Sequence, residues 1–118
     1  MADSDVPRPR ERKRESLAFD VMDLLICEPG LPQRRIAERL DISLGQVNLL
    51  LQSFHEDALV ERAGVHAGAS GHAETYVLTP KGEAVRTHLG KRVLPGKLSE
   101  FNRLRLQIER LTASGTTD

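Results

Sequence analysis

Two short amphipathic segments separated by a two-residue turn constrain the fold of this chain more than any other feature of its sequence. The first, at 32–40, and the second, at 43–55, each place apolar side chains on one helical face. Asp41 and Ile42 form the turn. Ser43 can cap the second helix, because its hydroxyl oxygen can accept a hydrogen bond from a free backbone N–H. Two short helices joined by such a turn are typical of a helix-turn-helix.

The flanking segments add a helix before this unit and a hairpin after it. From Ser16, apolar side chains recur on one helical face until residues 28–30, where Glu-Pro-Gly stops the helix. The apolar stretch at 58–62 and the β-prone run at 75–79 indicate two strands around a glycine-rich tip. A hairpin that follows a helix-turn-helix is a wing, so the sequence predicts a mainly α fold with a small β-hairpin.

A fourth helix and a C-terminal helix complete the chain. Pro80 can occupy the first turn of the fourth helix, which we expect to run to about Lys91 before Pro95 and Gly96 interrupt it. The C-terminal helix at 93–113 carries an apolar seam with the heptad spacing of a coiled coil. The residues of this apolar seam are Leu94, Phe101, Leu104, Ile108 and Leu111.

The apolar seam needs a partner, because a helix of so few heptads is too short to be stable on its own. It could pack back on its own domain. We favour a second copy of the chain, because the first helix already supplies the core of the small domain. The predicted organisation is a flexible basic arm at 1–14, a winged domain at 15–92, a dimerisation helix at 93–113 and a disordered tail at 114–118.

Charge divides the chain into three parts, although its 17 basic and 17 acidic side chains balance. Residues 1–14 carry a net +2, residues 15–79 a net −6, and residues 80–118 a net +4. Neutralisation of phosphates supplies much of a protein's affinity for DNA. A nucleic-acid partner would therefore have to be attracted by the arm, by the second helix and by the C-terminal half.

Several classes of protein are not expected from this composition. The chain has no apolar run near the roughly 20 residues of a membrane helix, and its polar N-terminus does not resemble a secretory signal. Cys27, the single cysteine, is expected to fill the core of a cytoplasmic protein. His66 and His72, near Glu74, fall short of the three or four ligands of a zinc site. No nucleophile–base set is credible, so we expect neither an enzyme nor a cofactor.

Two runs of sequence resemble bacterial MarR-type transcription regulators. Residues 31–62 are similar to their helix-turn-helix and first wing strand, and residues 76–86 to their second strand and following helix. The most similar branch is a group of small MarR-like regulators associated with exopolysaccharide gene clusters, which has similar runs at 42–48 and 78–82. The resemblance implies a homodimeric regulator of transcription that binds double-stranded DNA with the helix at 43–55 in the major groove.

The same resemblance implies roles for individual side chains. Gln46, Asn48 and Leu49 occupy positions where family members place base-contacting residues; glutamine and asparagine can pair with adenine, and leucine can touch a thymine methyl. Arg34 and Arg35 are placed to grip the DNA backbone. The full set of expected DNA-contacting residues is Arg34, Arg35, Ser43, Gln46, Asn48, Leu49, Gln52, Arg62, His66 and His72, joined by Arg10, Arg12, Lys13 and Arg14 of the arm.

The helix at 43–55 departs from the family pattern in a way that keeps a second function open. The branch more often has Lys, Tyr and Lys where this chain has Gln46, Leu49 and Gln52, and residues 43–54 contain no charged side chain. The wing tip at 63–73 has no lysine or arginine either. Such a surface attracts phosphates weakly. The alternative is a winged-helix module whose acidic core and uncharged helix bind another protein.

Overall fold

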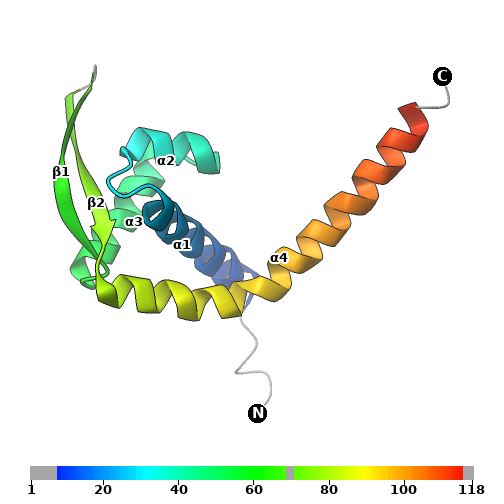
Figure 1. Ribbon diagram of the computed structural model, residues 1–118, viewed down its shortest axis with the longest axis horizontal. Coiled ribbons are helices and arrows are strands. Elements are labelled where there is room, and N and C mark those ends of the chain that lie inside the picture. The colour runs from blue at the N-terminus through cyan, green and yellow to red at the C-terminus, as the bar shows by residue number, and fades with distance from the viewer. Residues whose placement is uncertain (1–7, 69–70, 116–118) are drawn as a thin grey trace, which may run out of the picture.

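Helices and one antiparallel hairpin make up the computed structural model, which describes residues 8–68 and 71–115 (Figure 1). The elements follow in the order α1 (Pro9–Cys27), α2 (Gln33–Leu40), α3 (Leu44–Glu56), β1 (Val60–Gly68), β2 (Gly71–Leu78) and α4 (Pro80–Gly115). This order confirms the predicted mainly α fold with a small β-hairpin, a winged helix-turn-helix followed by a C-terminal helix.

Helices α2 and α3 form the predicted helix-turn-helix. Asp41 turns the chain with a φ of 54°, in the left-handed region that aspartate tolerates better than most residues. Ser43 then caps α3, because its Oγ accepts a hydrogen bond from the Gln46 N–H at 3.1 Å. The Gln46 side chain accepts one from the Ser43 N–H at 3.3 Å, which completes a capping box. The predicted cap is confirmed.

The core lies where α1, α2 and α3 meet the base of the hairpin. Full burial of an aliphatic side chain contributes about 1.5–3 kcal/mol to folding, so a few such residues hold this small domain together. The largest fully buried side chains are Met22, Leu25, Ile36, Leu51, Val21, Val47 and Val60.

Cys27 is exposed at the end of α1, so the prediction that it fills the core was wrong. The buried face of α1 runs through Val21, Met22 and Leu25. A helix turns about 100° per residue, so Cys27, two residues beyond Leu25, lies on the opposite side.

The wing is longer than predicted. Its strands pair from Val60 opposite Leu78 to Gly68 opposite Gly71, whereas the sequence indicated strands only at 58–62 and 75–79. The pairing shifts by one residue between Arg62 and Gly64, which is a β-bulge. Antiparallel strands are held by backbone hydrogen bonds, so the pairing continues through small residues that give no strand signal in sequence.

The arm predicted at 1–14 ends earlier than expected, because α1 begins at Pro9. Proline is favoured in the first helical turn, where its missing N–H costs nothing, and Glu11 accepts a hydrogen bond from the Arg8 N–H at 3.4 Å. Residues 10–14 are therefore helical. Residues 1–7 of the predicted arm lie outside the described residues.

Helix α4 continues through Pro95 and Gly96, so the predicted interruption of the helix was wrong. A proline inside a helix removes one hydrogen bond and displaces the preceding turn, so it kinks the helix. Figure 1 shows α4 changing direction where its colour passes from yellow to orange. The helix extends to Gly115, into the predicted tail; residues 116–118 lie outside the described part.

The start of α4 packs tightly on the base of the hairpin. Thr79 caps the helix, as predicted, by accepting a hydrogen bond from the Gly82 N–H at 3.0 Å. A Cβ on Gly82 would lie 2.0 Å from the carbonyl oxygen of Leu59. Glycine is therefore required at this position, because the neighbouring atom belongs to the backbone of the strand base.

Candidate nucleic-acid interface

From Leu44 to Phe54, helix α3 presents an outer face without charged side chains. Val47, Leu51 and Phe54 point into the core, which leaves the opposite side of the helix open. Leu49 is 68% exposed, more than any other large apolar side chain of the described residues. The predicted contact residues Ser43, Gln46, Leu49 and Gln52 are all exposed, whereas Asn48 is half-buried.

A cleft of 720 Å³ separates α3 from the wing. It brings together three predicted residues, Asn48, Gln52 and Arg62, with others that the sequence did not single out as binding residues. One arginine faces two glutamates in it, so the cleft carries little positive charge. The described lining consists of Gln33, Leu44, Gly45, Asn48, Gln52, His55, Glu56, Arg62, Glu74 and Tyr76.

Three amide side chains form a continuous hydrogen-bonded series at this cleft, the amide relay of Gln33, Asn48 and Gln52. The Gln33 Nε2 donates to the carbonyl oxygen of Glu74 on β2 at 2.8 Å. The Gln33 Oε1 accepts from the Asn48 Nδ2 at 3.2 Å. The Asn48 Oδ1 accepts from the Gln52 Nε2 at 2.8 Å. The relay therefore joins the backbone of the wing to the outer face of α3.

Arg62, one of the three predicted wing contacts, is held by a glutamate. Its Nε lies 2.8 Å from the Glu74 Oε2, and the Tyr76 hydroxyl donates to the same oxygen at 2.9 Å. The hydrogen bond with Tyr76 and the negative charge of Glu74 raise the pKa of Arg62 above its usual value. Arg62 thus stays cationic, but Glu74 offsets the positive charge that would otherwise attract a phosphate.

The side chains of His66 and His72 lie outside what the structure describes. Their backbones belong to β1 and β2, where each pairs with an alanine of the other strand.

Helix α2 carries the basic side chains nearest to α3 in sequence. Arg34 and Arg35 are exposed, and Arg35 approaches Glu38 at 4.0 Å. Arg39 is bound by Glu28, and this hydrogen bond lowers the pKa of the Glu28 carboxyl. Arg34, Arg35 and Arg39 are therefore all exposed cations of α2.

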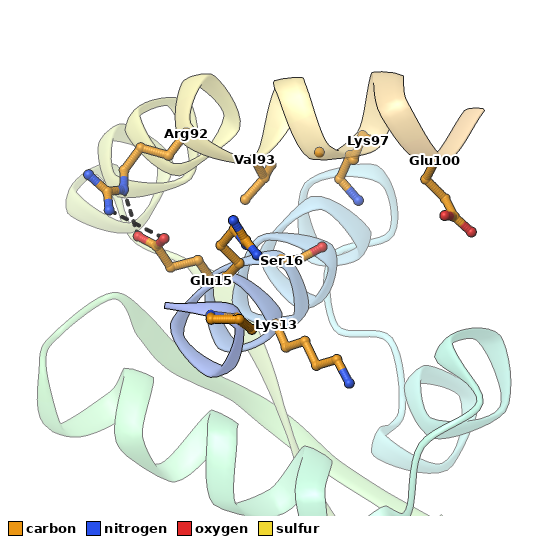
Figure 2. A pocket seen from close by; sticks show the side chains of 10 residues that line it. Lys13, Glu15, Ser16, Arg92, Val93, Lys97 and Glu100 are labelled. Carbon is orange, nitrogen blue, oxygen red and sulfur yellow. Dashed lines mark hydrogen bonds and ion pairs between the residues drawn. The ribbon is translucent and has the colours of Figure 1, made fainter. Parts of the chain in front are cut away.

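The basic residues of the predicted arm lie beside the bend of α4, at the end of α1 away from α2 (Figure 1). Arg12 and Lys13 line a second cleft, of 440 Å³, between α1 and α4. Figure 2 shows Glu15 and Arg92 joined across it, with Nε and Oε2 2.6 Å apart. This α1–α4 cleft has four basic and two acidic side chains, the opposite balance from the α3–wing cleft. Its charged residues are Arg12, Lys13, Arg92, Lys97, Glu15 and Glu100.

The apolar seam of α4 is exposed along its whole length. Its five residues are between 40% exposed, at Leu104, and 66% exposed, at Leu111. Beyond the bend, α4 runs away from the other elements (Figure 1). Within the described chain, the seam does not pack back on its own domain.

The described residues contain neither a membrane-spanning helix nor a cluster of metal-ligating side chains. None of the helices is both long and apolar enough to cross a membrane. No group of three or more His, Cys, Asp or Glu side chains that could hold a metal ion occurs in that part of the chain.

Comparison with known proteins defines the class. Residues 14–60, from α1 to the first residue of β1, match the family described as winged helix-turn-helix DNA-binding. No curated protein matches the chain in sequence. The chain contains a winged helix-turn-helix domain.

Solved structures place the fold more narrowly. A MarR family transcription regulator matches with a TM-score of 0.59 and 21% identity, over 92% of this chain and 80% of that one. The PcaV transcriptional regulator from Streptomyces coelicolor matches with a TM-score of 0.61 and 19% identity, over 86% and 78%. The transcriptional repressor CouR, bound to a 23-mer DNA duplex, matches with 0.57 and 25%, over 92% and 75%. The chain has the winged-helix fold of MarR-family transcription regulators.

The sequence did not indicate Gln33 or Glu74 as residues of the α3–wing cleft. Gln33 lies in the amphipathic segment at 32–40, where a polar residue is expected on the solvent face, yet it is only 3% exposed. Its partner on β2 is 41 positions away in the chain. No local pattern signals such a contact.

Proposed function

We propose that this chain is a MarR-like transcription regulator that binds double-stranded DNA with α3 in the major groove. The observation that carries the proposal is the exposed outer face of α3, capped by Ser43 and flanked by the wing. A major groove admits a helix, and the first-turn N–H groups beyond Ser43 can face a phosphate. CouR, which is similar in structure, is bound to a DNA duplex.

The resemblance to small regulators associated with exopolysaccharide gene clusters supports a finer assignment to that branch, and a cytoplasmic location. The two runs that carry it include residues with clear structural roles. Ser43 and Gln46 form the cap of α3, and Gly82 permits the close approach of α4 to Leu59. Exopolysaccharide genes beside this gene would support the assignment; their absence would contradict it.

DNA binding is tested by mobility shift with the promoter of the protein's own gene. At about 50 mM salt, where phosphate contacts are strong, we expect a shifted complex. Leu49→Asp should abolish it, because a carboxylate would lie among phosphates and base edges. His88→Ala, on the exposed surface of α4, is the control and should bind normally. No shift with the unaltered protein at that salt concentration would overturn the proposal.

We also propose that the protein is a homodimer joined along the apolar seam. Five apolar residues exposed in heptad register on one helix are stabilised by a matching helix. Two copies of residues 80–118, each with a net charge of +4, repel one another. Ion pairs within α4, at Arg103–Glu100 and Arg105–Glu109, offset part of that charge beside the seam.

The dimer is tested by light scattering on two matched variants. Ile108→Asp places a charge in the seam and should yield a monomer. Leu106→Asp makes the same kind of change two residues away, about 200° around the helix, at a side chain that is also exposed. Leu106→Asp should therefore remain a dimer. A dimeric Ile108→Asp protein would exclude the seam as the interface.

A second function is favoured by one observation. Leu44 and Leu49 are exposed on α3 while Glu74 offsets the charge of Arg62, which is a composition suited to a protein partner. A purified protein that binds one-to-one would support this function if Leu49→Asp abolishes binding and Arg34→Ala does not. A mobility shift that both variants weaken would favour DNA.

A further inference from the structure

The amide relay has a fixed direction of hydrogen bonding. The backbone carbonyl of Glu74 can only accept, so Gln33 must face it with its N–H₂ group. The Gln33 oxygen is then left to accept from the Asn48 N–H₂ group, and the Asn48 oxygen to accept from Gln52. One backbone atom of the wing therefore determines the orientation of all three amides.

The orientation of the Gln33 amide is the most strongly fixed of the three, because this side chain is buried. Gln33 is 3% exposed and is the buried polar side chain of the described residues, with both ends of its amide bonded. Asn48 is half-buried and also engages both its oxygen and its nitrogen. Exposure increases along the relay to Gln52, which is exposed and lines the α3–wing cleft.

The exposed end of the relay matches one base. Gln52 uses one N–H towards Asn48, so it presents its Oε1 acceptor and its remaining N–H donor to solvent. Adenine displays an N6 donor and an N7 acceptor side by side in the major groove. A glutamine held in one orientation loses less conformational freedom on binding than a free one.

We infer that Gln52 reads an adenine and that Gln33 is the buried positioning residue that sets its orientation through Asn48. This inference rests on the proposed DNA binding. It assigns Asn48 to positioning, where the sequence suggested direct base contact. The inference also gives the backbone of β2 a role in sequence specificity, because the relay begins at the Glu74 carbonyl oxygen.

The inference is tested by selecting binding sites from a random duplex library. The unaltered protein should select an A·T pair at one position of each half-site. Gln52→Met should reduce the preference for A·T over other pairs at that position about tenfold, which is the value of one bidentate base contact. Gln33→Met should reduce the preference at the same position by a similar factor. The double variant should lose no more than either alone, because both changes break one series.

Two further variants separate positioning from general stability. Asn48→Leu keeps much of the volume of the side chain but has no oxygen to accept from Gln52, so it should lose the same preference even if Gln33→Met fails to fold. Arg35→Met should weaken binding to all sequences alike and leave the selected sequence unchanged.

The outcomes are distinguishable. Three results would overturn the inference and leave DNA binding standing. The first is that Gln33→Met and Asn48→Leu retain the A·T preference. The others are a preference for another base pair at the position that Gln52 governs, and a loss spread over every position. An unaltered protein that selects no sequence would overturn the sequence-specific DNA binding proposed above, and the inference with it.

Discussion

The α3–wing cleft and the α1–α4 cleft differ in charge and in how their side chains are held. At the α3–wing cleft, Arg62 is offset by Glu74, and the polar groups of α3 are joined in the amide relay. At the α1–α4 cleft, basic side chains outnumber acidic ones. The chain thus separates the residues suited to recognising bases from much of its positive charge. Its zero net charge conceals this separation.

The largest expected effect compares two glycines of α4, Gly82 against the base of the hairpin and Gly90 against α1. A Cβ on Gly82 would meet the Leu59 backbone at 2.0 Å, whereas one on Gly90 would meet the Phe19 ring at 3.2 Å. Gly82→Ala should lower the free energy of unfolding by about 3 kcal/mol, since the backbone has to move. Gly90→Ala should change it by less than about 1 kcal/mol, because the ring can yield and alanine favours the helix. Denaturant unfolding measures both, and equal losses would contradict the comparison.

A smaller effect concerns which basic residues meet DNA. Replacing both Arg34 and Arg35 by alanine should lower the affinity for DNA about tenfold. It should also reduce the slope of log affinity against log salt concentration by the amount expected for about two phosphate contacts. The matched double variant of Arg12 and Lys13 should leave the salt dependence unchanged, because these residues lie beside the α4 bend. Binding titrations over a range of salt concentrations test this. The reverse result would assign the DNA contacts to the arm.

A gain of a few-fold in affinity is expected from Glu74→Gln. The neutral amide would release Arg62 to a phosphate, so binding should tighten and its salt dependence should steepen by about one contact. Glu100→Gln, in the α1–α4 cleft, is the matched control and should have no effect. Unchanged binding by Glu74→Gln would show that Arg62 does not face DNA.

The smallest effect is a shift in titration at two exposed carboxylates. Hydrogen bonds from Arg39 and Arg103 lower the pKa of Glu28 and Glu100, respectively. The stabilisation from each pair is present above the pKa of the unfolded carboxyl and is lost as pH falls through the lower folded value. In a carboxyl NMR titration, Arg39→Met should raise the midpoint of Glu28 alone, and Arg103→Met that of Glu100 alone. Unmoved midpoints would mean that the pairs do not persist in solution.

Much of the fold could be predicted from local pattern. Apolar spacing located α2 and α3, and Ser43 and Thr79 were recognisable as caps because capping depends on residues only three apart. The start of α1 was missed because charged residues such as Arg12 and Lys13 resemble an arm when their flanking helix is not considered.

The rest depended on contacts between distant segments. Pro95 ends most isolated helices, but here α1 supports both sides of the bend through Glu15–Arg92 and Asp20–Lys97. The orientation of Gln52 depends on Gln33 and on a strand 41 residues beyond it. Local windows of sequence contain none of these partners, so the hydrogen bonds that connect the residues of the α3–wing cleft could not be predicted from them.

The bend at Pro95 has a geometric consequence for the proposed dimer. If two copies pair along the apolar seam, the angle between the halves of α4 determines how far apart the two α3 helices stand. DNA repeats its major groove every 34–36 Å or so, about 10 base pairs. The bend at Pro95 would then determine the distance between the two half-sites of the operator. Straightening α4 would change this distance without altering the base read in each half-site.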